Sequence, residues 1–136
     1  MDAQEKPPDP AVRARPPVEP PLRVSVRREK GVPVVALAGT VQLDEYAALQ
    51  ARLLAAIEPG CPDLILDLSE LEFMGSPGLT AMLAARNAAA GHGGHVHLAG
   101  PRPAIGELLR IARLDRVFSI HDTVADALRA TGQPRD

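Results

Sequence analysis

A serine lies at the junction between an apolar segment and an alanine-rich one, in residues 73–79 (FMGSPGL). Residues 64–68 (LILDL) before it predict a strand, and the residues after it predict a helix from about Pro77 to Ala90. The free N–H groups and the positive dipole end of a helix N-terminus favour an anion, so phosphate can bind or be attached there. Ser76 is therefore the candidate phosphoacceptor, although we expect its hydroxyl to cap the helix by accepting an N–H of Gly78 or Leu79.

Acidic side chains form a second candidate group, in Asp67, Glu70 and Glu72. Carboxylates in a layered α/β fold can bind magnesium, as in a domain that is phosphorylated on aspartate. Such a domain also needs acidic residues after its first strand and a lysine after its last. No lysine occurs beyond Lys30, so the sequence does not predict this site.

Histidines form a third group, with His95 and His97 two apart on a predicted strand and His92 just before it. A zinc or nickel site would need further ligands, and no clear fourth ligand accompanies them. Alternation with apolar neighbours instead predicts a solvated strand face. We expect no metal site and no cofactor. With no nucleophile, base and orienting group together, we also expect no enzymatic activity.

Composition excludes several other functions. The 15 Lys and Arg against 17 Asp and Glu give no basic footprint for nucleic acid, and three aromatic residues offer few stacking platforms. No run approaches the ~20 apolar residues that span a bilayer. The single cysteine, Cys61, cannot form an intramolecular disulfide, and the first residues lack the apolar core of a secretory signal. We therefore predict a cytoplasmic protein without direct membrane insertion.

Hydrophobic periodicity and turn residues predict the elements that position the serine. Apolar alternation or apolar runs indicate strands at 22–27, 32–38, 64–68, 95–99 and 117–120. Apolar residues at helical spacing indicate helices from Asp44, as N-cap, to 57, from about 77 to 90, from 103 to 112, and after an Asp122 or Thr123 cap. The order predicts an α/β fold: a mixed, mostly parallel sheet of about five strands with about four helices.

Proline marks the ends of the predicted domain. Residues 1–21 hold seven of the 14 prolines and almost no large apolar side chain, so we expect a disordered tail. A single folded domain is predicted over residues 22–131, and residues 132–136 are expected to be a disordered C-terminus.

Several motifs, in their order and spacing, resemble the STAS domain of bacterial anti-sigma-factor antagonists over about residues 22–130. They are Gly39 at a strand end, 66–69 (LDLS), the Ser-x-Gly-Leu junction at 76–79, 98–101 (LAGP) and 108–109 (LL) followed by 114–118 (LDRVF). The resemblance implies a STAS fold and a non-enzymatic module that binds an anti-sigma factor or related serine kinase, influencing sigma-factor-dependent transcription. In that family the residue immediately before the junction glycine is phosphorylated.

Two departures from the family pattern fall at the implied binding site. The family's junction typically reads Asp-Ser-Ser-Gly, which places Gly75 at the acidic position and Pro77 at the phosphoacceptor. Because proline has no hydroxyl, we predict binding without the standard serine switch. The family often has Gly-Glu-Leu-Asp after the second strand, where this chain has 39–42 (GTVQ).

The resemblance assigns partner binding to the junction and to the segment after the second strand. The predicted partner-binding residues are Thr40, Gln42, Asp44, Gly75, Ser76, Pro77 and Gly78. The chain is expected to be a monomer or homodimer. The alternatives are a STAS subunit of a lipid-transport ABC complex and a stressosome-like scaffold.

Overall fold

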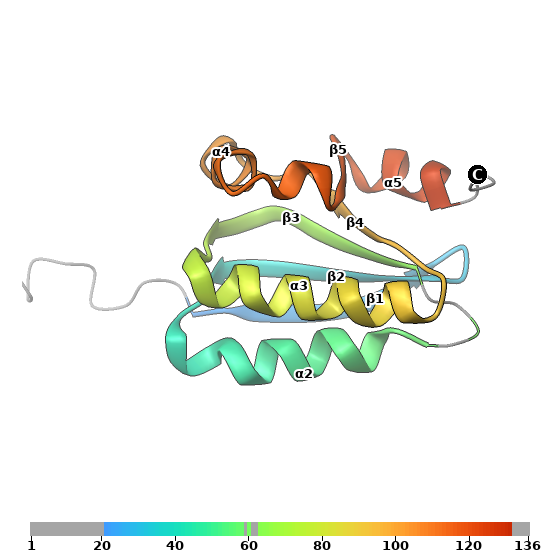
Figure 1. Cartoon of the computed structure of the whole chain (residues 1–136), viewed down its shortest axis with the longest axis horizontal. Helices are drawn as coiled ribbons and strands as arrows, with labels where there is room; N and C mark the ends of the chain where they lie inside the picture. The colour runs from blue at the N-terminus through green and yellow to red at the C-terminus, as the bar shows by residue number, and fades with distance from the viewer. Residues whose placement is uncertain (1–20, 59, 61–62, 132–136) are drawn as a thin grey trace, which may run out of the picture.

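The computed structural model describes residues 21–58, 60 and 63–131, and this part of the chain folds around one five-stranded sheet (Figure 1). The sheet order is β1 (Arg23–Glu29), β2 (Val32–Thr40), β3 (Leu64–Phe73), β4 (Val96–Ala99) and β5 (Ser119–His121). β1 pairs with β2 antiparallel and the other pairings are parallel. The helices are α2 (Tyr46–Ala56), α3 (Gly75–Gly91), α4 (Pro103–Ile111) and α5 (Val124–Thr131), with short 3-10 turns at Leu43–Glu45 (η1) and Leu114–Arg116 (η2). The predicted α/β class is confirmed.

The predicted tails, 1–21 and 132–136, lie outside the described residues except for Pro21. The predicted opening hairpin is present, and its turn contains Lys30 and Gly31 at φ 52° and 84°. Glycine adopts this left-handed region without steric cost.

The central strand β3 is buried on both faces, as its apolar run predicted. Leu64, Leu66 and Leu68 belong to the larger core cluster, together with Leu53 of α2 and Met82 of α3. Ile65 on the opposite face packs with residues of β2, β4 and α5, namely Val34, Ala99 and Ala127. Because successive strand side chains alternate between faces, one strand anchors both helix layers.

β3 is longer than predicted: the strand was expected to end at Leu68 and continues to Phe73. Ala36 of β2 pairs with Asp67 but Ala38 pairs with Glu70, so β3 carries one extra residue, a β-bulge. The bulge turns Glu70 to the same face as Asp67 and returns Leu71 to the core, where it is 0% exposed. The buried leucines at 64, 66, 68 and then 71 were the sequence signal for this shift.

Two other predicted boundaries were wrong. Asp44 does not cap the first helix, because Asp44 lies within the η1 turn and α2 starts only at Tyr46. The last strand begins at Ser119, not at 117, because Phe118 turns into the core, where it is 3% exposed. The predicted cap of the last helix is present, since Thr123 Oγ1 accepts the N–H of Asp126 at 3.0 Å.

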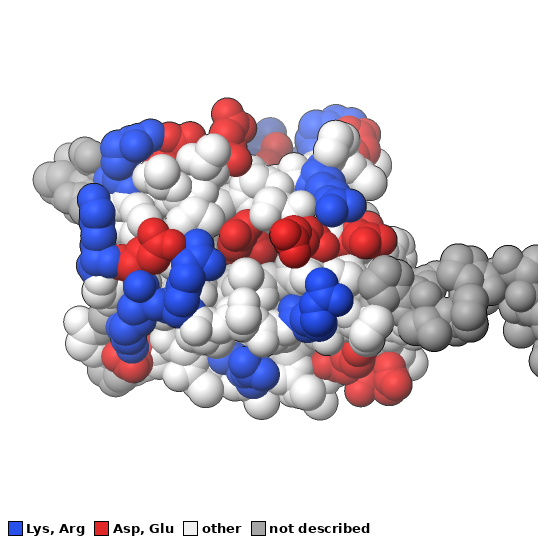
Figure 2. Space-filling view, turned by 180° about the vertical axis from the view of Figure 1, so that it is seen from behind, with Lys and Arg blue, Asp and Glu red and all other residues white. Residues whose placement is uncertain are grey.

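The second face of the sheet is only partly covered. α5 packs over β3, β4 and β5, while a groove of about 660 Å³ on the same face is lined by strand residues alone, from β1, β2 and β3. On this face several acidic side chains form a row across the middle, and basic side chains lie both above and below it (Figure 2). The fold therefore leaves part of one sheet face open.

Candidate functional site

The ends of β2 and β3 meet at one edge of the sheet, because the two strands are parallel neighbours. Thr40 pairs with Phe73, and the N–H of Val41 donates to the carbonyl oxygen of Phe73 at 2.8 Å. The segment that follows β2 therefore lies beside the start of α3. The structure thus brings together the two parts of the chain that hold the predicted partner-binding residues.

Helix α3 starts two residues earlier than predicted, at Gly75, with Met74 in the N-cap position. The N–H of Gly78 donates to the Met74 carbonyl oxygen at 3.1 Å, and no side chain caps this end. Ser76 is exposed and lies inside the first turn, so the predicted capping role of its hydroxyl is wrong. Pro77 also lies in this turn, where its missing N–H would have no partner within the helix.

Replacing Ser76 with alanine should consequently change the free energy of unfolding by less than about 0.5 kcal/mol. Thr123→Ala is the matched control, because its hydroxyl does cap a helix and its loss should cost about 1 kcal/mol. Urea unfolding of both variants measures the difference. A Ser76→Ala loss as large as that of the control would contradict the geometry.

The backbone at Gly75 disfavours the acidic residue that the family pattern places there. Its φ is +54°, and a Cβ at this position would approach the ring of Phe73 to 3.2 Å. Residues that carry a side chain rarely adopt this backbone conformation. The glycine and the phenylalanine are therefore matched to one another.

The turn after β2 is held by one carboxylate. Glu45 accepts the N–H of Gln42 at 3.0 Å and, through its other oxygen, the N–H of Leu22 at 3.3 Å. Thr40 is only 4% exposed, and its hydroxyl accepts the Gln42 amide at 3.5 Å. Gln42 and Asp44 are exposed. Thr40 is thus placed to support the turn, whereas Gln42 and Asp44 can meet a visiting molecule.

Two apolar residues at this edge escaped the sequence analysis. The side chain of Leu43, in η1, is 79% exposed and that of Phe73, at the end of β3, is 57% exposed. An exposed apolar side chain beside polar loops is typical of a protein-binding surface. Leu43 lies outside the apolar stripe of the following helix. This position was the one feature of the sequence that could have predicted its exposure.

Comparison with known proteins assigns the family. The model described as "Mlab, STAS domain" matches residues 24–130. This chain belongs to the STAS domain family. The anti-sigma-F factor antagonist RsfB of Mycobacterium tuberculosis is 29% identical to this STAS domain over 107 residues, covering 79% of this chain and 87% of that protein.

Two further relatives agree. An anti-sigma F factor antagonist of Paenibacillus polymyxa is 27% identical over 110 residues, covering 79% of this chain and 92% of that protein. The crystal structure of an anti-sigma factor antagonist from Mycobacterium paratuberculosis superposes with a TM-score of 0.75 at 28% identity, covering 83% of this chain and 96% of that one. The expected STAS fold is confirmed.

None of the helices in the described part of the chain is long and apolar enough to cross a membrane.

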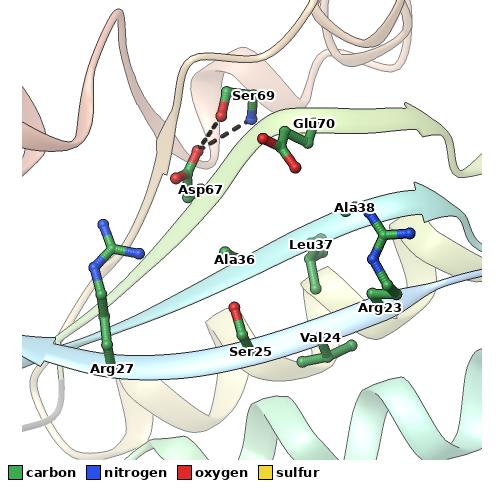
Figure 3. Close-up of a pocket in the computed structure, with 10 residues that line it drawn as sticks. All are labelled: Arg23, Val24, Ser25, Arg27, Ala36, Leu37, Ala38, Asp67, Ser69 and Glu70. Carbon is green, nitrogen blue, oxygen red and sulfur yellow. Dashed lines mark hydrogen bonds between the residues drawn. The ribbon is translucent and has the colours of Figure 1, made fainter.

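The acidic residues of this STAS domain do not converge on a metal site. Asp67 points into the open groove, and one of its oxygens accepts the N–H and the hydroxyl of Ser69 at 3.1 and 2.8 Å (Figure 3). Within residues 21–58, 60 and 63–131, no three His, Cys, Asp or Glu side chains are arranged to hold an ion.

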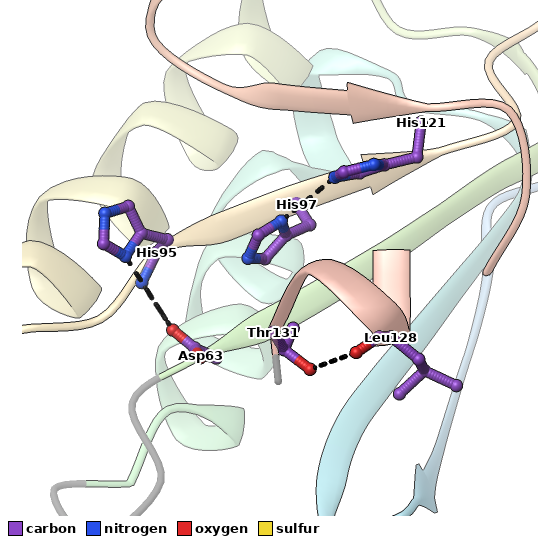
Figure 4. Close-up of polar contacts among 6 residues, drawn as sticks. All are labelled: Asp63, His95, His97, His121, Leu128 and Thr131. Carbon is purple, nitrogen blue, oxygen red and sulfur yellow. Dashed lines mark hydrogen bonds and ion pairs between the residues drawn. The ribbon is translucent and has the colours of Figure 1, made fainter. Parts of the chain in front are cut away.

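The predicted solvated face is present at His95, which is exposed, but the prediction is wrong for His97, which is 2% exposed and covered by α5 (Figure 4). Its Nδ1 lies 3.1 Å from Nε2 of His121 on β5. The backbone N–H of His95 donates to a carboxylate oxygen of Asp63 at 2.8 Å, and the ring centres of His95 and His97 are 6.4 Å apart. His92 is exposed, and Cys61 lies outside the described residues.

Proposed function

We propose that this STAS domain is a non-enzymatic regulator that binds an anti-sigma factor or a related serine kinase and so influences sigma-factor-dependent transcription. The contact would be made by the strand-end surface, defined as Gln42, Leu43, Asp44, Phe73, Gly75, Ser76 and Pro77. The observation that carries the proposal is the exposure of Leu43 and Phe73 beside this polar turn. The relatives named as anti-sigma factor antagonists support the class of partner. Sigma factors act on transcription, so we expect the cytoplasm as the site of action.

The chemistry of the strand-end surface suits a protein partner. Leu43 and Phe73 are apolar anchors whose burial in a partner's pocket would supply much of the affinity. Gln42, Asp44 and Ser76 are exposed polar groups that would fix orientation at the rim. Thr40 and Gly78 are buried, so they would support this surface without contacting the partner.

Binding should be independent of phosphorylation at position 77, because proline offers no oxygen to a kinase. Ser76 is the one hydroxyl residue in the junction 75–78. It lies at the first turn of a 17-residue helix, where an added phosphate would be favoured by the dipole but would change the surface presented to the partner. We infer that this regulator is constitutively competent, or is controlled elsewhere.

Binding can be tested with the full chain and anti-sigma factors or serine kinases from the same genome, by calorimetric titration. Phe73→Ser and Leu43→Ser should each raise the Kd about tenfold or more, because each removes an apolar anchor. Ile120→Ser is the matched control: its side chain is 38% exposed, but it lies on β5, separated from β2 by two strands. Failure of the unmodified chain to bind any of these proteins would overturn the proposal.

Phosphorylation is tested separately, by incubating the chain with its bound kinase and ATP. We expect the peptide that contains residues 75–78 to keep its unmodified mass, since Pro77 replaces the acceptor. Mass spectrometry with a phosphoacceptor relative as positive control makes the measurement. A phosphate on Ser76 would show instead that the acceptor has moved by one residue.

A further inference from the structure

Strand β1 lies at one edge of the sheet, and its outer side has no neighbouring strand within residues 21–58, 60 and 63–131. Proteins usually keep such edges short or covered, because their free N–H and C=O groups can pair with another chain. The other edge strand, β5, follows this rule with three residues. β1 has seven residues, and most of their side chains are exposed. Its outer side, called here the β1 edge, is therefore a candidate docking site for an added strand.

The register of the β1–β2 hairpin shows which backbone groups point outward. Residues 30–31 form a two-residue turn with positive φ values, so the flanking pair, Glu29 and Val32, is hydrogen-bonded. Hydrogen-bonded and non-hydrogen-bonded pairs alternate along an antiparallel ladder. The residues whose N–H and C=O groups point away from β2 are therefore Val24, Val26 and Arg28.

Two contacts show that α2 runs alongside the β1 edge. The guanidinium of Arg52 on α2 donates to the carbonyl oxygen of Val24 at 3.4 Å, an oxygen that β2 does not use. Arg28 pairs with Glu58, just past the end of α2, at 2.6 Å. The first contact is long and uses one outward acceptor, so the other outward groups stay open to an added strand.

An apolar strip lies on the side of β1 that faces α2. Val24 packs against the main core cluster, and Val26, two residues further on the same face, is 48% exposed. Ala48 and Ala55, four residues before Arg52 and three after it, share its side of α2 and are exposed. Small side chains on the helix leave room for an apolar side chain to settle beside Val26.

The opposite face of β1 is basic. Arg23 and Arg27 point to the open groove side of the sheet, and Arg27 also pairs with Glu29 at 2.6 Å (Figure 3). β1 and its turn together hold four basic residues and one acidic residue, namely Arg23, Arg27, Arg28, Lys30 and Glu29. A strand added at this edge would therefore meet positive charge on the groove side and apolar atoms on the helix side.

We propose that the β1 edge binds an extended segment of a partner protein in which acidic and apolar residues alternate. The segment would join the sheet about 4.8 Å from β1, hydrogen-bonded to the outward backbone groups. Its acidic side chains would lie beside Arg23 and Arg27, and an apolar one beside Val26, because cross-strand neighbours share a face. A second copy of β1 fits less well, since it would bring two mainly basic strands together.

The probe is a synthetic peptide as long as β1 in which glutamate and valine alternate, titrated into the full isotope-labelled chain. In the free chain the outward amides of Val24, Val26 and Arg28 should exchange hydrogen quickly, whereas those of Ser25 and Arg27 are protected by β2. Saturating peptide should slow exchange at the three outward amides about tenfold or more. Absence of binding, or binding that leaves these amides unprotected, would overturn the proposal.

Val26→Pro tests the backbone contact, because proline has no N–H to offer an added strand. Proline is tolerated on an edge strand where the N–H faces solvent, so the variant should stay folded, which circular dichroism verifies. Its Kd for the peptide should rise about tenfold or more. Val26→Ile is the matched control, since it keeps the N–H and the apolar side chain and should bind like the unmodified chain. Equal affinity of the two variants would contradict strand addition.

Charge is tested with a second peptide in which lysine replaces every glutamate. This peptide should bind about tenfold more weakly or not at all, and salt should weaken binding of the glutamate peptide. Arg23→Glu should weaken it as well, whereas Arg86→Glu, beside β5 at the other edge of the sheet, should not. Equal affinity for the two peptides would rule out an acidic partner.

The second copy is tested by sedimentation velocity of the free chain. A dimer that Val26→Pro dissociates would make another β1 the occupant and overturn the proposal, and a monomer would support it. The inference goes beyond the proposed function, because the β1 edge is separate from the strand-end surface. Phe73→Ser should leave the affinity for the glutamate peptide unchanged, so each proposal can fail without the other.

Discussion

Replacing Leu66 with alanine is expected to lower the free energy of unfolding by about 3 kcal/mol, within the ~2–5 kcal/mol range of buried leucine truncations. Leu66 lies in the centre of β3, between Val35 of β2 and Leu98 of β4, and is 0% exposed. Strands surround it on both sides and helices cover it. The cavity left by the substitution cannot collapse easily, so the loss of hydrophobic burial and the loss of van der Waals contacts both lower the free energy of unfolding. Equilibrium unfolding in urea measures the change.

Leu43→Ala is the matched control for this loss, because the same side chain is 79% exposed there. Its free energy of unfolding should change by less than about 0.5 kcal/mol. The same substitution should weaken partner binding, whereas Leu66→Ala should leave the affinity of the folded protein unchanged. Equal stability losses in the two variants would contradict the described core.

Replacing Gly78 with alanine should destabilise the chain by about 1–3 kcal/mol, although alanine is the better helix former. A Cβ at Gly78 would lie 2.5 Å from the Cβ of Met74, closer than two non-bonded carbon atoms can approach. Met74 is 0% exposed and belongs to the main core cluster, so it cannot move aside without disturbing the packing. Thermal and urea unfolding measure this effect.

Gly106→Ala provides the control with the opposite sign. Gly106 lies within α4, and a Cβ there would meet nothing within 4 Å. Alanine should stabilise this helix by about 0.5–1 kcal/mol, because it reduces the freedom of the unfolded chain. Stabilisation by alanine at Gly78 as well would show that the start of α3 is looser than described.

The periodicity of the sequence was sufficient for the element order and for the two-sided cover of β3. It failed at boundaries where two neighbouring segments fix each other's geometry. β3 runs past Leu68 because β2 offers pairing as far as Thr40, and two register shifts, between Ala36 and Ala38 and between Gly39 and Thr40, absorb the mismatch between the strands. Helix α3 begins at Gly75 because the N–H of Gly78 bonds to the Met74 carbonyl oxygen, and the chain enters this turn through the left-handed backbone of Gly75 beside the ring of Phe73. Neither the strand pairing nor this contact can be predicted from the secondary-structure propensities of single residues.

The candidate site also has some features that the sequence predicts and others that only packing decides. The junction at 73–79 and the missing hydroxyl at Pro77 are properties of the sequence alone, since they depend on residue type and local order. The exposure of Leu43 and Phe73, the burial of His97 under α5 and the bulge that turns Glu70 depend on packing. Local spacing determines which elements form, but the register between strands and the cover of each face are set by contacts between residues distant in the chain. Only the tertiary structure could therefore decide which side chains face a partner.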